Sequence, residues 1–315
     1  MGMATKILAK EYTKLEGHKQ GVYALVWCDL EGVLVSAGGD GSVVKWSVPL
    51  DVDVGPDGVV GVLFAQLPEP VFSLMVGLEG EIWAGSQGGN LYVLRAKSAP
   101  RVMALGSSVF FIQRWLDGKI AVGLGSGVLV FFDDAMQELD RVSVGQKSLR
   151  CCLGDRGLVG GSEGCIWQLN AEGSVIQRFE ANSPSVFCLV GREDGGWVSG
   201  GRDALLWWFG ADGGVEEKVK AHLYTIHALV LEPGEGRWLA SGGMDKSIKI
   251  WDAQKNTLLK VVDRLKFPNF GHIHSVNALA WLGDHDGRKA SRVGRRLLAS
   301  AGDDKIICVW DLSIE

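Results

Sequence analysis

One short pattern recurs along the chain, and it limits the possible folds more than any other feature. Its clearest copies are LVSAGGDGSVVKWS (34–47), LASGGMDKSIKIWD (239–252) and LASAGDDKIICVWD (298–311). In each copy an Asp follows a Ser by four residues, and a Trp follows the Asp by six. A pattern that returns at this spacing indicates one supersecondary unit repeated around or along a scaffold.

Four weaker copies fill the space between the clear ones. They are IWAGSQGGNLYVLR (82–95), IAVGLGSGVLVFFD (120–133), LVGGSEGCIWQLN (158–170) and WVSGGRDALLWWFG (197–210). The anchor positions then fall at 46, 94, 132, 169, 209, 251 and 310. A propeller blade repeats about every 40–45 residues, so the two widest gaps indicate insertions within one domain that spans 1–315.

A short apolar segment precedes every copy, as in GVYALVW from Gly21 and SVNALAW from Ser275. Each unit is therefore predicted to contain this first strand, two strands on either side of the Gly/Asp turn of the repeat, and a less regular fourth strand. A single sheet with two apolar faces is unstable in water, whereas seven stacked around an axis cover one another. We expect an all-β, closed seven-bladed propeller of four-stranded antiparallel blades, its last blade completed by an N-terminal strand at 7–15. A β-sandwich of similar strand density is the alternative.

The composition agrees with a large folded core. Hydrophobic residues make up 47% of the chain and the net charge is −5, which argues against disorder and against a basic nucleic-acid platform. The six cysteines form no C-x-x-C pair, and no cofactor or metal is expected. Without a signal peptide or a long apolar segment, the sequence predicts a cytoplasmic protein, and we expect a monomer.

On these copies the chain resembles the WD-repeat family over almost its whole length. The resemblance implies a buried His–Ser–Asp–Trp network in three units: His18, Ser36, Asp40 and Trp46; His222, Ser241, Asp245 and Trp251; His272, Ser300, Asp304 and Trp310. The fifth unit keeps Ser199 and Asp203, with Asn182 at the His position. A hydrolase triad is the alternative, but a set that recurs with Trp and without a G-x-S-x-G elbow favours a structural role.

The last two units narrow the resemblance further. The stretches GGMDKSIKIWD and FGHIHSVNALAW are most similar in appearance to cytoplasmic WD-repeat proteins of Bacteroidetes-type bacteria. This resemblance brings no established activity with it.

The resemblance also implies a docking face around the central channel. By motif, the face positions on the inner strands are Tyr23, Phe72, Phe110, Arg150, Phe187, His227 and Asn277, joined on the same side by the turn residues Gln87, Arg202, Met244 and Asp303. Aromatic and Arg side chains dominate binding hot spots. We expect a peptide or loop that inserts an apolar anchor while its acidic group reaches Arg150 or Arg202. The alternative is that the aromatic rings fold inward and plug the channel.

Two insertions could add contacts. In RLKFPNF (264–270), Phe267 and Phe270 flank Pro268, which predicts an exposed apolar lip on the docking face. The other insertion, 283–296, carries Arg288, Lys289, Arg292, Arg295 and Arg296. It is interpreted first as a solvated loop, and second as a contact for an acidic protein, nucleic acid or a membrane surface.

The function predicted from these features is a non-catalytic protein–protein interaction scaffold. One alternative is an enzyme with a site at the channel mouth, where the sequence offers His227 and Asp303 but no obvious partner for either. Another is binding of nucleic acid or an acidic surface through the basic loop 288–296.

Overall fold

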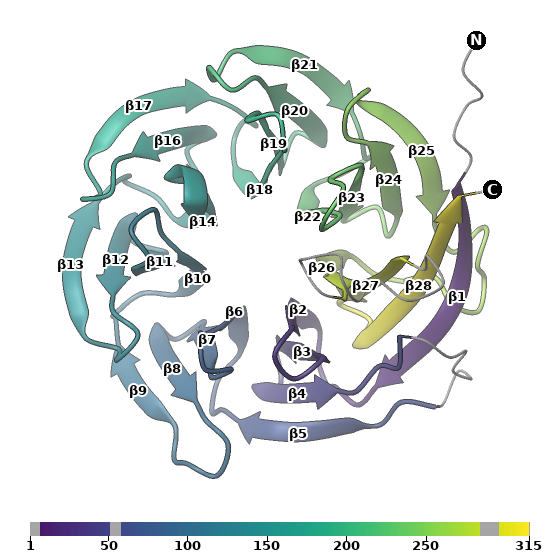
Figure 1. The fold of residues 1–315 in the computed structure, drawn as a ribbon, viewed down its shortest axis with the longest axis horizontal. Helices are drawn as coiled ribbons and strands as arrows, with labels where there is room; N and C mark the ends of the chain where they lie inside the picture. Colours follow the sequence, from purple (N-terminus) through teal and green to yellow (C-terminus); the bar gives the residue numbers. More distant parts are fainter. Residues whose placement is uncertain (1–6, 51–57, 284–295, 315) are drawn as a thin grey trace.

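The computed structural model describes residues 7–50, 58–283 and 296–314. Within them the strands form seven four-stranded antiparallel sheets arranged in a ring around one axis (Figure 1). This confirms the predicted seven-bladed propeller. We number the blades one to seven by their innermost strand in chain order.

In every blade but the seventh, four successive strands run from the axis to the rim. The innermost strands are β2 (Val22–Cys28), β6 (Val71–Val76), β10 (Val109–Arg114), β14 (Leu149–Leu153), β18 (Val186–Gly191), β22 (Ile226–Leu231) and β26 (Val276–Leu282). The second strands are β3 (Val33–Gly38), β7 (Ile82–Ser86), β11 (Ile120–Leu124), β15 (Leu158–Gly161), β19 (Trp197–Gly201), β23 (Trp238–Gly243) and β27 (Arg296–Gly302).

The third strands carry the anchor positions of the repeat. They are β4 (Ser42–Trp46), β8 (Asn90–Leu94), β12 (Val128–Phe132), β16 (Cys165–Leu169), β20 (Leu205–Phe209), β24 (Ile248–Asp252) and β28 (Ile306–Ile314). The outermost strands are β5 (Gly61–Gln66), β9 (Arg101–Ala104), β13 (Glu138–Ser143), β17 (Val175–Glu180), β21 (Val215–Lys220), β25 (Thr257–Val262) and, in the seventh blade, β1 (Ile7–Glu16). A 3-10 turn, Gly154–Arg156, follows β14.

The N-terminal strand closes the ring. β1 pairs antiparallel with β28, from Ile7 opposite Ile314 to Glu16 opposite Ile306, so the two ends of the chain lie side by side at the rim (Figure 1). Its side chains Ile7 and Leu15 are buried. Because each terminal segment is hydrogen-bonded to the other, neither is a free end that can fray from the ring.

The hydrophobic core is divided among the interfaces between blades. One apolar cluster lies between each pair of neighbouring sheets; Trp27 and Leu34 of blade one, for example, pack with Ala299 and Val309 of blade seven. The second strand of each blade is buried on both faces, which explains why these segments are continuous runs of small and branched apolar residues. The core thus holds the blades in a rigid ring around the channel.

The three predicted polar networks are present. In blade one, Trp46 Nε1 donates to Ser36 Oγ at 2.8 Å, Ser36 Oγ lies 2.8 Å from His18 Nε2, and His18 Nδ1 lies 3.2 Å from Asp40. Blades six and seven repeat this arrangement with Ser–His distances of 2.8 and 2.9 Å. Asp40 also accepts hydrogen bonds from the backbone N–H groups of Lys19 and Ser42. These bonds link the segment before β2 to the turn between β3 and β4.

The serines of these networks are inaccessible. Ser36, Ser241 and Ser300 are fully buried, and each hydroxyl oxygen already accepts a Trp N–H. A nucleophile must reach its substrate, so these three sets act as structural staples between strands.

Blade five keeps a modified network. Asn182 Nδ2 donates to Asp203 at 2.9 Å, Ser199 Oγ donates to Asn182 Oδ1, and Trp207 Nε1 donates to Asp203 at 3.0 Å. The side-chain amide of Asn182 therefore takes the place of the His imidazole: its N–H group donates to Asp203, and its oxygen accepts from Ser199.

Two degenerate blades carry carboxylate networks that the sequence did not reveal. In blade two, Glu69 accepts hydrogen bonds from Asn90 Nδ2 and from the Tyr92 hydroxyl at 2.9 Å. In blade four, Glu163 stands six residues before the anchor Leu169, as Asp40 stands before Trp46, and accepts the N–H groups of Gln146 and Lys147. Neither network uses the His–Ser–Asp–Trp set, which these two blades lack, so each is a different polar network at the same end of its blade.

Candidate functional site

A backbone irregularity at the start of every innermost strand creates the candidate site. Val22 and Ala24 pair with the successive residues Gly38 and Ala37, so Tyr23 between them is left out of the ladder. The same register shift recurs in the other six blades, and the residues left out are Phe72, Phe110, Arg150, Phe187, His227 and Asn277. An extra residue in a β-bulge is redirected relative to its neighbours, and here all seven redirected side chains line one cavity.

This channel-mouth cavity has a volume of about 400 Å³ and is lined by those seven side chains and Asp303. A further cavity of about 270 Å³ continues along the channel and reaches residues deeper on the inner strands, such as Leu25, Gln113 and Leu189. The seven bulge residues, which we call the bulge ring, therefore stand at the entrance of the channel.

Stacked rings form the first half of the bulge ring. The Tyr23 and Phe72 ring centroids are 5.7 Å apart in an edge-to-face arrangement, and the Phe72 and Phe110 rings stack at 5.6 Å. On the other side Phe187 lies 5.8 Å from the His227 ring. These contacts fix the aromatic side chains of neighbouring blades against one another.

Arg150 bridges the two aromatic groups. The central carbon of its guanidinium lies 3.9 Å from the Phe110 ring centroid and 4.7 Å from that of Phe187. Burial lowers the pKa of the Arg150 guanidinium from its usual value. Among the described residues no carboxylate pairs with it and no acceptor takes its N–H groups, so its in-plane donors are available to a ligand.

The remaining part of the bulge ring is polar and closes the circle. Asn277 Nδ2 donates to Asp303 at 2.7 Å and to the Val22 carbonyl at 3.2 Å, which links blade seven to blade one. Burial, followed by the negative charge of Asp303, raises the pKa of the Tyr23 hydroxyl. The cavity therefore has an acidic side at Asp303 and a basic side at Arg150.

His227 and Asp303 do not form an acid–base pair. Burial lowers the pKa of His227, the charges of Arg150 and His222 act in the same direction, and Asp303 opposes them. No hydrogen bond joins His227 to a carboxylate in the part of the chain that the structure describes. Nor does that part hold three or more His, Cys, Asp or Glu grouped as metal ligands would be.

Not all predicted face residues reach the cavity. Gln87, Arg202 and Met244 lie on turns between second and third strands and are exposed outside it. Of the two residues predicted to meet an acidic group, Arg150 lines the cavity and Arg202 lies outside it. Asp303, the fourth turn residue, does line it.

The predicted apolar lip at 264–270 is wrong. Phe270 is 5% exposed, and its ring packs edge-to-face on Trp310 at 4.8 Å, while the half-buried Phe267 contacts the same Trp at 5.1 Å. The exposed apolar residue of this insertion is instead Leu265. Since both Phe rings cover the network Trp of blade seven, they belong to the core.

The basic loop residues Arg288, Lys289, Arg292 and Arg295 lie outside the described residues. Arg296, which ends that loop, is described: it pairs with Glu232 and, at 3.2 Å, with Glu235 on the connection between β22 and β23. Its guanidinium also stacks over Trp238 at 4.6 Å. Arg296 is thus committed to an intramolecular contact.

The chain has sequence similarity to a known repeat. Residues 9–47, 216–252 and 265–311 match the family model described as WD domain, G-beta repeat. These segments contain the three complete His–Ser–Asp–Trp networks.

Three curated relatives match about a third of the chain each. Protein HIRA of Dictyostelium discoideum is 33% identical over 95 residues, pre-mRNA-splicing factor PRP46 of Candida albicans is 30% identical over 92, and nuclear distribution protein PAC1 of Tuber melanosporum is 37% identical over 95. The matches cover 28%, 29% and 29% of this chain, but only 8%, 19% and 17% of those proteins. These relatives are eukaryotic, and the similarity to Bacteroidetes-type bacterial proteins is not supported by them.

The fold has a close structural counterpart. The crystal structure of the WD40 β-propeller domain of Doa1 superimposes with a TM-score of 0.78, and the match covers 96% of both chains at 16% sequence identity. At this identity the likeness establishes the fold alone. In the described residues no helix is long and apolar enough to cross a lipid bilayer.

Proposed function

Since this chain carries WD repeats within a complete seven-bladed propeller, we propose that it is a non-catalytic interaction module that binds a peptide or loop of a partner protein at the channel mouth. Relatives that share these repeats typically mediate protein–protein interactions, which supports a protein partner. The proposal includes a monomeric protein that acts in the cytoplasm.

The observation that supports this proposal most strongly is that Arg150 is largely buried and has no carboxylate partner among the described residues. A cation taken out of water without a counter-charge costs free energy, and burial here lowers its pKa. The two Phe rings hold the guanidinium plane in place by cation–π contacts, which leaves its edge for hydrogen bonds. A carboxylate is the group that fits this edge, because it accepts two parallel N–H donors.

The remaining bulge ring indicates the rest of the ligand. Phe72, Phe110 and Tyr23 present a stacked apolar surface beside Arg150, which suits an apolar side chain of the partner. Asp303 and Asn277 lie opposite and suit backbone N–H or basic groups. We therefore propose that an acidic residue or a C-terminal carboxylate reaches Arg150 while a neighbouring apolar side chain contacts the aromatic rings. The exposed Arg202 and Met244 would contact outer parts of the partner.

The test is affinity capture from lysate of the source organism, analysed by mass spectrometry. Wild type is compared with a variant that carries Phe110→Ala, Arg150→Glu and Phe187→Ala. The proposal expects a partner that wild type retains and the variant loses, although the two proteins have the same far-ultraviolet circular dichroism and melt cooperatively.

A matched control variant carries Leu30→Ala, Leu78→Ala and Lys97→Glu. These exposed residues lie on loops between first and second strands or after third strands, at the opposite end of the blades from the bulge ring. The control should keep the partner. Equal capture by all three proteins, or loss by the control alone, would remove the case for the channel mouth.

A further inference from the structure

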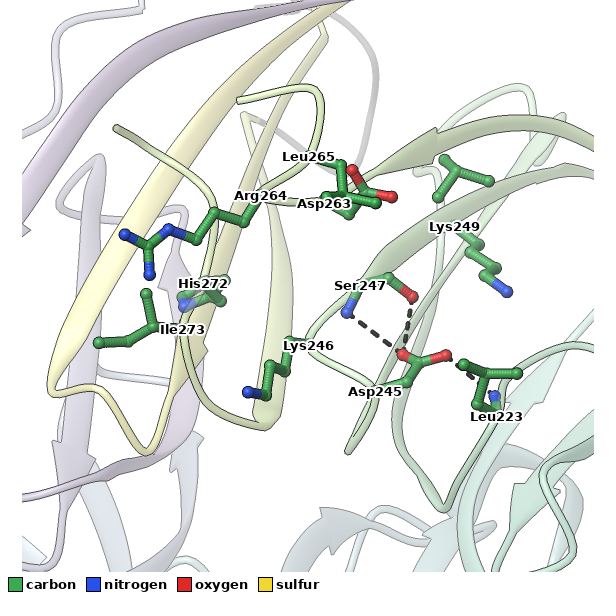
Figure 2. Close-up of a pocket in the computed structure, with 11 residues that line it drawn as sticks. Leu223, Asp245, Lys246, Ser247, Lys249, Asp263, Arg264, Leu265, His272 and Ile273 are labelled. Atoms are coloured by element: carbon green, nitrogen blue, oxygen red, sulfur yellow. Dashed lines mark hydrogen bonds between the residues drawn. The ribbon is translucent and has the colours of Figure 1, made fainter. Parts of the chain in front are cut away.

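A second cavity lies on the docking side, away from the channel, between blades six and seven. It is about 480 Å³ in volume and is formed by the segment before β22, the β23–β24 turn with the start of β24, and the connection from β25 to β26 (Figure 2). We call it the blade 6–7 groove and define it by Leu223, Lys246, Lys249, Arg264, Leu265 and Ile273. None of these residues lines the channel-mouth cavity.

The groove is rich in cationic groups. Lys246 is exposed, Lys249 Nζ donates to the Ala221 carbonyl, and Arg264 Nε donates to the Pro268 carbonyl at 3.1 Å. Among the described residues none of the three forms an ion pair with a carboxylate. In a protein of net charge −5, this local excess of positive charge suits an acidic ligand.

The two acids in the groove are already occupied by local hydrogen bonds. Asp245 accepts the N–H groups of Leu223 and Ser247, the Ser247 hydroxyl and His222 Nδ1, as the dashed lines in Figure 2 show in part. Asp263 accepts the N–H of Lys266 at 3.1 Å, which caps the turn that follows β25. Asp245 and Asp263 together offset two of the three cations, so the lining keeps a net positive charge.

Aliphatic side chains form the rim. Leu265 is 94% exposed, Leu223 72% and Ile273 39%. Large apolar groups gathered beside a cavity are a feature of protein-binding surfaces, where a partner removes them from water. No exposed aromatic ring stands among these six residues, so the groove lacks the stacking platforms that single-stranded nucleic acids use.

From this combination we infer that the blade 6–7 groove is a second docking site, whose ligand is an acidic peptide segment of a partner protein that carries a leucine-like side chain. The carboxylates pair with Lys246 and Arg264, and the aliphatic side chain packs between Leu223, Leu265 and Ile273. This inference is independent of the ligand that enters the channel mouth.

Fluorescence anisotropy with defined peptides tests it. The probe is a fluorescein-labelled, end-capped peptide with the sequence EDELLEDE, titrated with the full chain at low salt, where charge pairing is least screened. We expect saturable binding. The peptide QNQLLQNQ, which keeps the leucines, and EDESSEDE, which keeps the charges, should each bind at least ten-fold more weakly.

Three variants then locate the site. The double variant Lys246→Glu/Arg264→Glu should weaken binding of EDELLEDE at least ten-fold. The matched variant Lys10→Glu/Lys97→Glu makes the same change in net charge at exposed lysines outside the groove and should bind within two-fold of wild type. The titrations of the first two variants are repeated in the Arg150→Glu background, where the channel mouth no longer offers a cation to an acidic group. The same ten-fold loss in the groove variant there distinguishes a failure at the channel mouth from a failure here.

Each opposite result contradicts the inference. It is wrong if EDELLEDE does not saturate, or if the Lys10/Lys97 variant loses as much affinity as the groove variant. Tighter binding of a ten-nucleotide oligo-dT than of EDELLEDE, lost in the groove variant, would assign the groove to nucleic acid instead. Unchanged melting of every variant confirms that lost binding is not lost folding.

Discussion

The guanidinium of Arg150 lies 3.9 Å from the ring centroid of Phe110, on the adjacent blade, and each of these residues is the bulged residue of its innermost strand. The contact therefore depends on two equivalent backbone irregularities in neighbouring sheets. The same irregularity in all seven blades places seven side chains at the channel mouth. Blade geometry sets where these side chains lie, and their identities set what the mouth can bind.

An unpaired cation at this position should reduce stability. Replacing Arg150 by Met removes the charge and keeps a long apolar side chain between Phe110 and Phe187. We expect the free energy of unfolding to be unchanged or to rise by about 0.5–2 kcal/mol, as often occurs when a functional charge is removed. Urea unfolding of both proteins measures this. A clear loss of stability would mean that Arg150 serves the fold.

The serine at the centre of each network should be important for stability. Ser36→Ala leaves Trp46 Nε1 and His18 Nε2 without their buried partner. We expect a loss of about 1–3 kcal/mol for each orphaned group, seen as a lower melting temperature by calorimetry. The exposed Ser98→Ala serves as control and should melt like wild type. Equal melting of the two variants would rule out the staple role.

Acid should destabilise the protein through the same networks. Burial alone would raise the pKa of Asp40, Asp245 and Asp304, but hydrogen bonds from backbone N–H groups and from the paired His lower it below the usual value. As pH falls through about 4, the unfolded chain takes up protons that the folded chain refuses, so stability is lost. The stability that these networks contribute should be fully present at pH values above this transition. Urea unfolding at pH 7, 5 and 4 measures the decline.

The variant Asp304→Asn separates this effect from general acid sensitivity. Its amide cannot titrate, so its stability should start lower at pH 7 and decline less between pH 5 and 4 than that of wild type. An identical decline in both proteins would show that other groups govern acid unfolding.

The corrected insertion gives a paired comparison of neighbouring residues. Phe270→Ala removes a buried ring that packs on Trp310, and we expect a loss of about 3–5 kcal/mol. Leu265→Ala removes a side chain that is 94% exposed and should change stability by less than about 0.5 kcal/mol. Chemical unfolding of the two variants measures these free-energy losses and shows whether each side chain belongs to the core or to the surface. Similar, small losses would restore the interpretation of an exposed lip.

The sequence predicts the ring well because spacing and burial pattern repeat. The three Ser–Asp–Trp copies and the four weaker copies together place seven third strands, and the terminal segments together complete the last blade. The motif also locates the seven face positions on the innermost strands. The residue types at these positions do not predict that each one is a β-bulge. Tyr23 and Asn277 have no chemistry in common; only their place in the repeat relates them.

Other parts of the site could not be read from the chain. Phe267 and Phe270 are apolar residues around a proline, and whether such a segment turns outward or covers Trp310 depends on tertiary packing. Glu69 and Glu163 form networks in blades that lack the His and the Trp, because a carboxylate can accept the same N–H groups from a different position. The blade 6–7 groove combines residues from three separate segments and has no local signature.

Whether Arg150 anchors an acidic group of a partner at the channel mouth can be measured by isothermal titration calorimetry. The partner identified by capture, or the segment of it that binds, is titrated into wild type and into Arg150→Met. We predict that affinity falls at least ten-fold in the variant, whose fold is intact or more stable. Equal affinity for the two proteins would contradict the claim and place the partner elsewhere on the propeller.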